Sequence, residues 1–468
     1  MKLTIILPRV KNSFFSLSLI LSAVIILCTS AMLWQITYLA PTFQLISIIP
    51  AVYTLVFIVC RRFADFTSPG CFTIHLIGFL RYMLTPFIIV TSKQLSAMEH
   101  AFDDIGSAVL IMIIEMIFIF GATLLYNPHD IVRPADKIRF PSIIKFLAIM
   151  AFLFFAIDNR SLIGNLSVFS GKVTVEDTNA TSGIVSIIWQ ALCAFIFCFI
   201  INDIASNRRH KRLLLLSLVC GLIYLLVIFT GQTELSRWYT IVTLIAMTFW
   251  MFKLYPNRKR SILLAVLIPT FVLIFVASIL KNTDVGLGAG WGKSLNSMFN
   301  STNMDSYFAG PANVSNAIAT NRIYSPGLGS LFFDIFNNFP VINHIFDHTH
   351  ASVNYFARYL SRGDQILPLV GQSFTWFSYA LTPLLSVLSV IMTKKLDAKF
   401  RGTDGIFTYL YGFFAVWCAL MPVLNMTIWL SWIYARIIPA FLLFRIVTLK
   451  SSYPVRLGGR NEYQSKQH

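Results

Sequence analysis

The chain has 468 residues, of which 56% are apolar and only 12% are charged, and its formal net charge is +17. Its mean hydropathy is +0.71, whereas soluble domains are typically about 45–50% apolar, so the composition excludes an ordinary soluble protein. Such a positive charge would indicate nucleic-acid binding in a soluble chain, but most lysines and arginines lie in short connectors between apolar stretches, where they set membrane orientation.

About twelve apolar stretches follow one another, and most are long enough to cross a bilayer as a helix of about 20 residues. Connectors rich and poor in lysine and arginine alternate between them, which predicts a multi-span membrane protein with both termini in the cytoplasm. The first stretch is too long for a signal peptide and no small-residue cleavage site follows it, so we expect an uncleaved span. The expected spans are 14–34, 38–60, 71–91, 105–126, 141–157, 183–203, 213–230, 238–254, 262–280, 373–393, 405–424 and 427–448.

The predicted fold class is therefore an all-α polytopic membrane protein with about 12 transmembrane helices. We expect nine spans in 1–280, a large extracytoplasmic loop at 281–372, three spans in 373–448 and a cytoplasmic tail at 449–468. The loop is half apolar from Gly327 to Phe346, which is typical of short helices that lie in the membrane interface. We expect this loop to cap the bundle and to carry the function.

Two charges lie near the middle of expected spans, Arg81 in the third and Glu115 in the fourth. A lone charge at that depth costs about 2.5–3.5 kcal/mol on insertion scales, so such residues pair or line a polar cavity. Neighbouring antiparallel spans place both at similar depth, and we expect them to meet. Two interpretations stay open, a structural ion pair and a binding role for Arg81 toward a charged ligand. Arg436 in the last span raises the same question without an obvious partner.

Arginines and amide or aromatic side chains gather at the expected outer face. Guanidinium groups suit phosphate because their planar fork gives two parallel charge-assisted hydrogen bonds, and tyrosine and glutamine suit the hydroxyls of sugar rings. A solvated surface loop has a similar composition, so both interpretations stay open. The candidate binding residues are Arg81, Arg237, Arg322, Arg358, Arg362, Tyr307, Gln365 and Gln372.

No metal or cofactor site is expected. His344, His348 and His350 form a His-x3-His-x-His pattern, but no glutamate or cysteine stands at a familiar metal-ligand spacing. All seven cysteines fall in or beside expected spans, so the outer loop has no disulfide framework. The chain also lacks a phosphate-cradling glycine loop and a nucleophile elbow, which leaves an ATP-driven function without support.

Several segments together carry a family resemblance: LRYMLTP at 80–86, the mid-span Glu115, LSR at 235–237, YFAGPANV at 307–314, and GDQILP at 363–368 with GQS at 371–373. With about twelve spans and a dominant late outer loop, the chain resembles the bacterial O-antigen/oligosaccharide repeat-unit polymerases over essentially its whole length. The Arg362-Gly363 order departs from the glycine-arginine pair of that family.

The resemblance implies a glycosyltransferase of lipopolysaccharide biosynthesis, in the inner membrane of a bacterium. Such enzymes transfer a growing glycan from undecaprenyl diphosphate to the non-reducing end of a new lipid-linked repeat unit at the periplasmic face. The implied partners are undecaprenyl-diphosphate-linked oligosaccharides, the bilayer and a chain-length regulator protein, with no cofactor. The arginines would stabilise the leaving diphosphate, and Asp364, Asp305 or His350 would take the proton of the attacking hydroxyl. The alternatives are a flippase for lipid-linked units and an O-antigen ligase.

Overall fold

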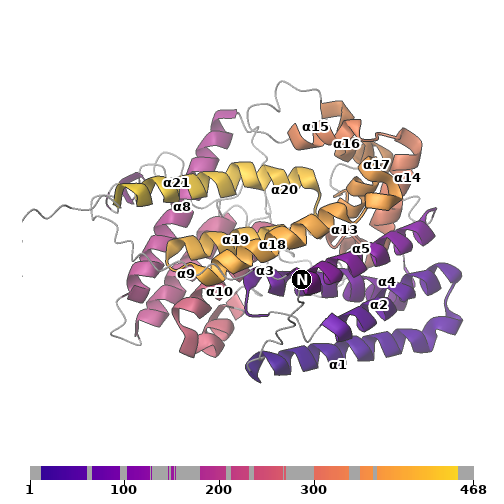
Figure 1. Ribbon diagram of the computed structural model, residues 1–468, viewed down its shortest axis with the longest axis horizontal. Coiled ribbons are helices and arrows are strands. Elements are labelled where there is room, and N and C mark those ends of the chain that lie inside the picture. The colour runs from indigo at the N-terminus through magenta and orange to yellow at the C-terminus, as the bar shows by residue number, and fades with distance from the viewer. Residues whose placement is uncertain are drawn as a thin grey trace, which may run out of the picture.

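A computed structural model describes residues 12–60, 66–94, 103–126, 128, 146, 149–151, 153, 180–206, 212–230, 237–266, 268–269, 300–336, 348–361 and 366–451. Within these residues every regular element is a helix and no strand occurs (Figure 1). The longer helices are α1 (Asn12–Gln35), α2 (Pro41–Cys60), α3 (Pro69–Phe79), α5 (Ile105–Leu125), α8 (Ala180–Ser206), α9 (Arg212–Thr230), α10 (Arg237–Leu254), α14 (Pro311–Tyr324), α17 (Leu369–Leu381), α18 (Leu384–Gly402), α19 (Ile406–Ala419) and α21 (Ile438–Ser451). The shorter ones are α4 (Thr85–Ser92), α13 (Ser301–Tyr307), α15 (Gly329–Phe336), α16 (Ser352–Leu360), α20 (Met426–Trp432), and η1 (Ile36–Tyr38), η2 (Leu80–Leu84), η4 (Pro256–Arg258), η6 (His348–His350), η7 (Met421–Val423) and η8 (Ile433–Ile437).

Seven helical stretches in the described part are long and apolar enough to cross a membrane, or nine if each of two bent pairs is one span. They agree with most of the expected spans, which supports a membrane-embedded helical protein. The expected span at 141–157 and most of the one at 262–280 lie outside the described residues. The part of α9 that is apolar, Leu214–Ile228, is shorter than the others.

The expected span 373–393 is two helices. Helices α17 and α18 meet at an angle of 106°, with Thr382 and Pro383 between them. Proline has no N–H to donate and its ring clashes with the preceding turn, so Pro383 ends α17 and begins α18. The sequence predicts a kink here, whereas the structure shows a break near a right angle.

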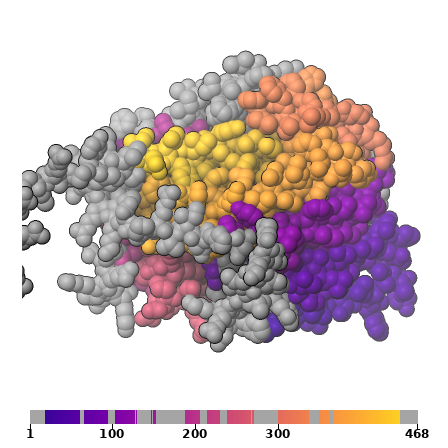
Figure 2. Space-filling view, in the orientation of Figure 1, coloured from indigo at the N-terminus to yellow at the C-terminus, as the bar shows by residue number. Residues whose placement is uncertain are grey.

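The core has two apolar clusters. One joins α8, α9, α10, α19 and α21, and the other joins α1–α5 with side chains from α14 and α17. Figure 1 shows α18 and α19 between these two groups, and both helices contact α3. The short helices of 300–361 lie together at one end of the molecule (Figure 2). This end holds the polar residues described below.

Side chains from distant helices satisfy several buried helix ends. Asp397 of α18 accepts hydrogen bonds from the N–H groups of Gly70 and Cys71, at 2.9 and 2.8 Å, and thereby caps the N-terminus of α3. Lys253 of α10 donates to the carbonyls of Phe400 and Arg401 at the end of α18, at 3.0 and 2.9 Å. The first and last turns of a helix leave backbone groups without partners, and a carboxylate and an ammonium complement the respective ends of the helix dipole.

Candidate functional site

Helix α14 is a polar helix packed inside the protein. Asn313, Ser315, Asn316 and Thr320 are all buried, and the helix packs against α5, α16 and α17. Hydrogen bonds satisfy part of this polar surface: the amide of Asn313 donates to the carbonyl of Ile366 at 2.9 Å, for example. The segment expected to cap the bundle therefore also contributes a helix to its interior.

Asp305 of α13 caps α14. Its two carboxylate oxygens accept from the N–H groups of Ala312 and Asn313, at 3.0 and 2.7 Å, and the residue is fully buried. Burial raises the pKa of this carboxyl to about 7, although the two N–H bonds and the charge of Arg81 act to lower it. Both oxygens are thus occupied by backbone donors, which gives Asp305 a structural task that competes with the predicted role as a base. Tyr307, the last residue of α13, is half-buried.

Arg81 and Glu115 form a fully buried ion pair, with 2.7 Å between Arg81 Nη2 and Glu115 Oε2. The carboxylate also accepts from the hydroxyls of Tyr82 and Ser386, at 3.0 and 2.6 Å. Arg81 lies in the π-helical turn η2, a conformation that is rare and often found at functional sites. Its Nη1 donates to the carbonyl of Pro422 in η7. The pair therefore connects three spans to the segment between α19 and α20.

Gln372 connects that same segment to the short helices. Its Oε1 accepts from the N–H of Met426 at 2.7 Å, and its Nε2 donates to the hydroxyl of Ser352 at 3.1 Å. The side chain is fully buried. Asn425 completes the segment by capping α20 through a 2.7 Å bond from the N–H of Ile428. The predicted sugar-binding residue Gln372 is thus held in place by two internal hydrogen bonds.

Asp334 of α15 lies beside Gln372 at the N-terminus of α16. It accepts from the N–H of Ser352 at 3.0 Å and from the indole of Trp376 at 3.2 Å. The indole also donates to Ser330 at 3.1 Å. Burial raises the pKa of Asp334 to about 6, against the lowering effect of the bonds from Ser352, Gln372 and Trp376. This carboxylate fixes the position of α16, which carries the exposed residues of the next paragraph.

Three candidate side chains meet on the exposed side of α16. His350 Nδ1 lies 3.0 Å from the hydroxyl of Tyr355, and the guanidinium of Arg358 lies 5.9 Å from the centroid of the same tyrosine ring. The ring of Tyr324, at the end of α14, is 5.4 Å away. His350 and Arg358 are exposed. We call His350, Tyr355, Arg358 and Tyr324 the α16 cluster; it offers a base, a cation and two aromatic faces to solvent.

Arg322 lies on a neighbouring turn of α14 and pairs with Asp104. Its side chain is 65% exposed, whereas that of Asp104 is 4% exposed, so the guanidinium keeps an open side toward solvent. Tyr359 lies nearby: burial and the charges of Asp103 and Asp104 raise its pKa, and Arg322 lowers it. Arg322 thus adds a second exposed cation close to α16.

The structure does not describe every predicted site residue. Arg237 begins α10, but its side chain falls outside the described part. The remaining ones outside it are Arg362, Asp364 and Gln365, with the histidines His344 and His348 as far as their side chains are concerned. Among described residues, no group of three or more histidines, cysteines and acids is placed to hold a metal ion.

Two features escape sequence reasoning. One is the use of buried aspartates to cap other helices, as with Asp305, Asp334 and Asp397. A sequence signal exists for two of them, because α3 and α14 begin with proline and their N-cap residues make no side-chain bond. The other feature is the involvement of Ser352 and Trp376, which are ordinary residues in a loop until Asp334 joins them.

Comparison of the chain with protein-family models, with curated proteins and with solved structures finds no match.

Proposed function

We propose that this protein is a membrane glycosyltransferase that polymerises undecaprenyl-diphosphate-linked oligosaccharide repeat units. In this proposal it acts at the periplasmic face of a bacterial inner membrane, with both termini in the cytoplasm, and builds O-antigen or a related surface polysaccharide. The resemblance of its sequence segments to such polymerases motivates the assignment. The site in the proposal is the α16 cluster together with Arg322.

The observation that carries the proposal is the grouping of His350, Tyr355 and Arg358 on one exposed side of α16. Histidine is the side chain that most often serves as a general base, and arginine is suited to phosphate. Tyrosine offers a flat face and a hydroxyl to a sugar ring. The buried Asp334 anchors the first turn of the same helix, so these groups sit on a fixed support, as a positioned catalytic site needs.

The reaction follows from these groups. A hydroxyl at the non-reducing end of the incoming repeat unit attacks the anomeric carbon of the growing glycan. The new carbon–oxygen bond forms as the bond from that carbon to the diphosphate breaks, and the hydroxyl proton passes to His350. Arg358 and Arg322 stabilise the charge that develops on the departing undecaprenyl diphosphate. The products are the glycan extended by one unit on the new lipid carrier and a free lipid diphosphate.

Asp305 fits the base role less well than His350, because its two oxygens accept backbone N–H bonds and it is fully buried. Asp364, which lies outside the described residues, stays a candidate for the base, and Arg362 and Gln365 beside it stay candidates for binding. Undecaprenyl-diphosphate-linked oligosaccharides and a chain-length regulator are the partners in this proposal.

The test is the surface-glycan ladder of cells that lack the gene and carry a plasmid copy. We expect wild type to restore the ladder, and His350→Ala and Arg358→Ala to leave a single-repeat-unit band at normal protein levels. Arg258→Ala is the matched control, since Arg258 is exposed in η4 away from 300–361. Loss of every glycan-bearing band would favour a flippase, and polymer that accumulates only on the lipid carrier would favour a ligase; either outcome would refute the proposal.

A further inference from the structure

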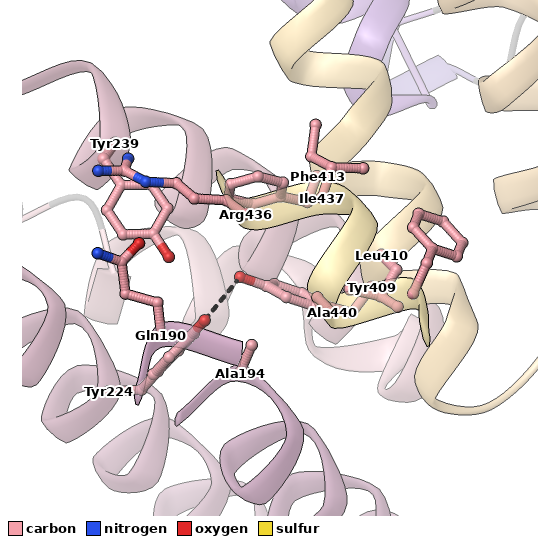
Figure 3. A pocket seen from close by; sticks show the side chains of 11 residues that line it. Gln190, Ala194, Tyr224, Tyr239, Tyr409, Leu410, Phe413, Arg436, Ile437 and Ala440 are labelled. Carbon is pink, nitrogen blue, oxygen red and sulfur yellow. Dashed lines mark hydrogen bonds between the residues drawn. The ribbon is translucent and has the colours of Figure 1, made fainter. Parts of the chain in front are cut away.

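Arg436 lies between two aromatic rings inside the bundle. Its guanidinium carbon is 3.9 Å from the centroid of the Tyr239 ring and 4.0 Å from that of Trp432. Figure 3 shows the guanidinium over the ring of Tyr239. The residue belongs to the π-helical turn η8, midway along the candidate span Met426–Ile446. Both rings contact the flat faces of the guanidinium, so its hydrogen-bonding edge is left for another group.

No carboxylate pairs with Arg436 among the residues that the structure describes. Arg81, the other arginine within a span, has Glu115 at 2.7 Å. Arg436 has only ring contacts, and its Nη1 is buried without a hydrogen-bond acceptor in the described part. A charge inside a membrane normally pairs with an opposite charge or lines a functional cavity. Aromatic faces attract a cation, but they leave its N–H groups without acceptors.

A hollow lies beside the guanidinium (Figure 3). Its empty volume is about 350 Å³ with its open mouth included, which exceeds the size of a phosphate group. Polar groups line it together with Arg436: the amide of Gln190 and the hydroxyls of Tyr224 and Tyr409, which are 3.2 Å apart. Hydroxyls and an amide N–H are donors, and none of the described lining residues is acidic. The hollow therefore favours an anion.

We propose that Arg436 binds an oxyanion of the phosphate class in this hollow. The two rings orient the guanidinium so that its edge presents parallel N–H groups, the geometry in which arginine binds phosphate. The phosphate comes from a lipid headgroup or from a soluble phosphate compound, and the chemistry is the same for both. This site uses none of the α16 cluster residues, and the inference does not rest on the proposed function.

The experiment measures binding of radiolabelled pyrophosphate to the purified full chain in phosphatidylcholine nanodiscs. We expect saturable binding, and a loss of affinity on the order of tenfold or more in Arg436→Gln, because charge-assisted hydrogen bonds are lost. Arg258→Gln, which changes an exposed arginine by the same chemistry, should bind as wild type does. Arg436→Lys keeps the charge but loses the fork and the stacking, and should also bind more weakly.

Competition identifies the source of the phosphate. Displacement by farnesyl diphosphate at lower concentration than by pyrophosphate indicates a polyprenyl diphosphate, and displacement by phosphatidylglycerol in the nanodisc indicates an acidic phospholipid. If pyrophosphate itself does not bind, the same comparison is made with labelled farnesyl diphosphate and labelled phosphatidylglycerol. If none of the three binds saturably, or if Arg436→Gln binds as wild type does, the proposal is wrong. Should Arg436→Gln fail to accumulate, wild-type affinity in Arg436→Lys overturns it equally.

Discussion

Arg81 and Gln372 hold the same short segment from two different helices. Arg81 donates to the carbonyl of Pro422, and Gln372 accepts from the N–H of Met426 at 2.7 Å. Between these contacts the chain leaves α19, passes through η7 and enters α20. Backbone that is not helical at membrane depth has to be satisfied by other protein groups. These two buried side chains do so, and they thereby join the intramembrane ion pair to the network around Asp334.

Removal of one member of the Arg81–Glu115 pair should strongly destabilise the protein. Arg81→Gln leaves Glu115 as an unpaired buried carboxylate, and such changes cost about 3–5 kcal/mol. We expect a lower melting temperature and reduced membrane accumulation, measured by fluorescence-detected size-exclusion chromatography after heating. Arg258→Gln, at the surface, is the control and should melt as wild type does.

The charge-swapped protein, Arg81→Glu with Glu115→Arg, separates pairing from backbone support. It keeps opposite charges but places a carboxylate where Arg81 donates to the Pro422 carbonyl. We expect the swap to recover only part of the lost stability. A swapped protein that melts at the wild-type temperature would show that the contact with Pro422 contributes nothing.

Truncation of Gln372 tests the other contact with this segment. Gln372→Ala removes the acceptor for the Met426 N–H and the donor to Ser352. Each buried polar group left without a partner costs about 1–3 kcal/mol, so we expect a clear fall in melting temperature. Gln44→Ala is the control, because Gln44 is half-buried and donates one bond, to the carbonyl of Leu39. Equal effects of the two changes would contradict the role given to Gln372.

The sequence predicts the helical class and most spans, because apolar length and charge placement report on the bilayer directly. It also predicts that Arg81 and Glu115 should meet, and the structure has them 2.7 Å apart, since an isolated charge in a span needs a partner. The same reasoning leaves Arg436 without a partner, and its aromatic neighbours Tyr239 and Trp432 come from positions that no local pattern connects.

The candidate site is harder to predict than the spans. His350 and Arg358 can be named from residue type, but their common contact with Tyr355 depends on the turn between η6 and α16. The break between α17 and α18 is also missed, since Pro383 indicates a kink but not an angle of 106°. Asp305 and Gln372 look like polar loop residues in sequence, yet tertiary packing buries both and occupies their polar atoms.

Asp305 should make the stability of the protein depend on pH. Its pKa is about 7 in the folded protein and 3.8 ordinarily, so the folded state holds this proton more tightly. As pH rises from about 4 to about 7 the unfolded state releases the proton first, and stability falls; above that range this contribution is constant. We expect a lower melting temperature at pH 8 than at pH 5, and a smaller difference in Asp305→Asn.

Part of the pH dependence should persist in that variant, because the pKa of Asp334 is also raised, to about 6. Asp404→Asn is the control, since the Asp404 side chain is 61% exposed, and it should show the wild-type difference between the two pH values. An unchanged difference in Asp305→Asn would mean that the Asp305 carboxyl is not the group that titrates.

Gly310, the N-cap residue of α14, should not tolerate a side chain. A Cβ there would overlap Asp305 Oδ1 and lie 2.9 Å from Thr85 Cγ2, so alanine would push the capping carboxylate away from α14. Overpacking of this kind typically costs about 1–3 kcal/mol, and we expect Gly310→Ala to lower the melting temperature accordingly. Gly106 in α5 is the matched control, because a Cβ there meets nothing within 4 Å and alanine in a helix is favoured over glycine by about 0.5–1 kcal/mol. Gly106→Ala should therefore melt at or slightly above the wild-type temperature, and a Gly310→Ala protein that did the same would show that Asp305 can cap α14 from another position.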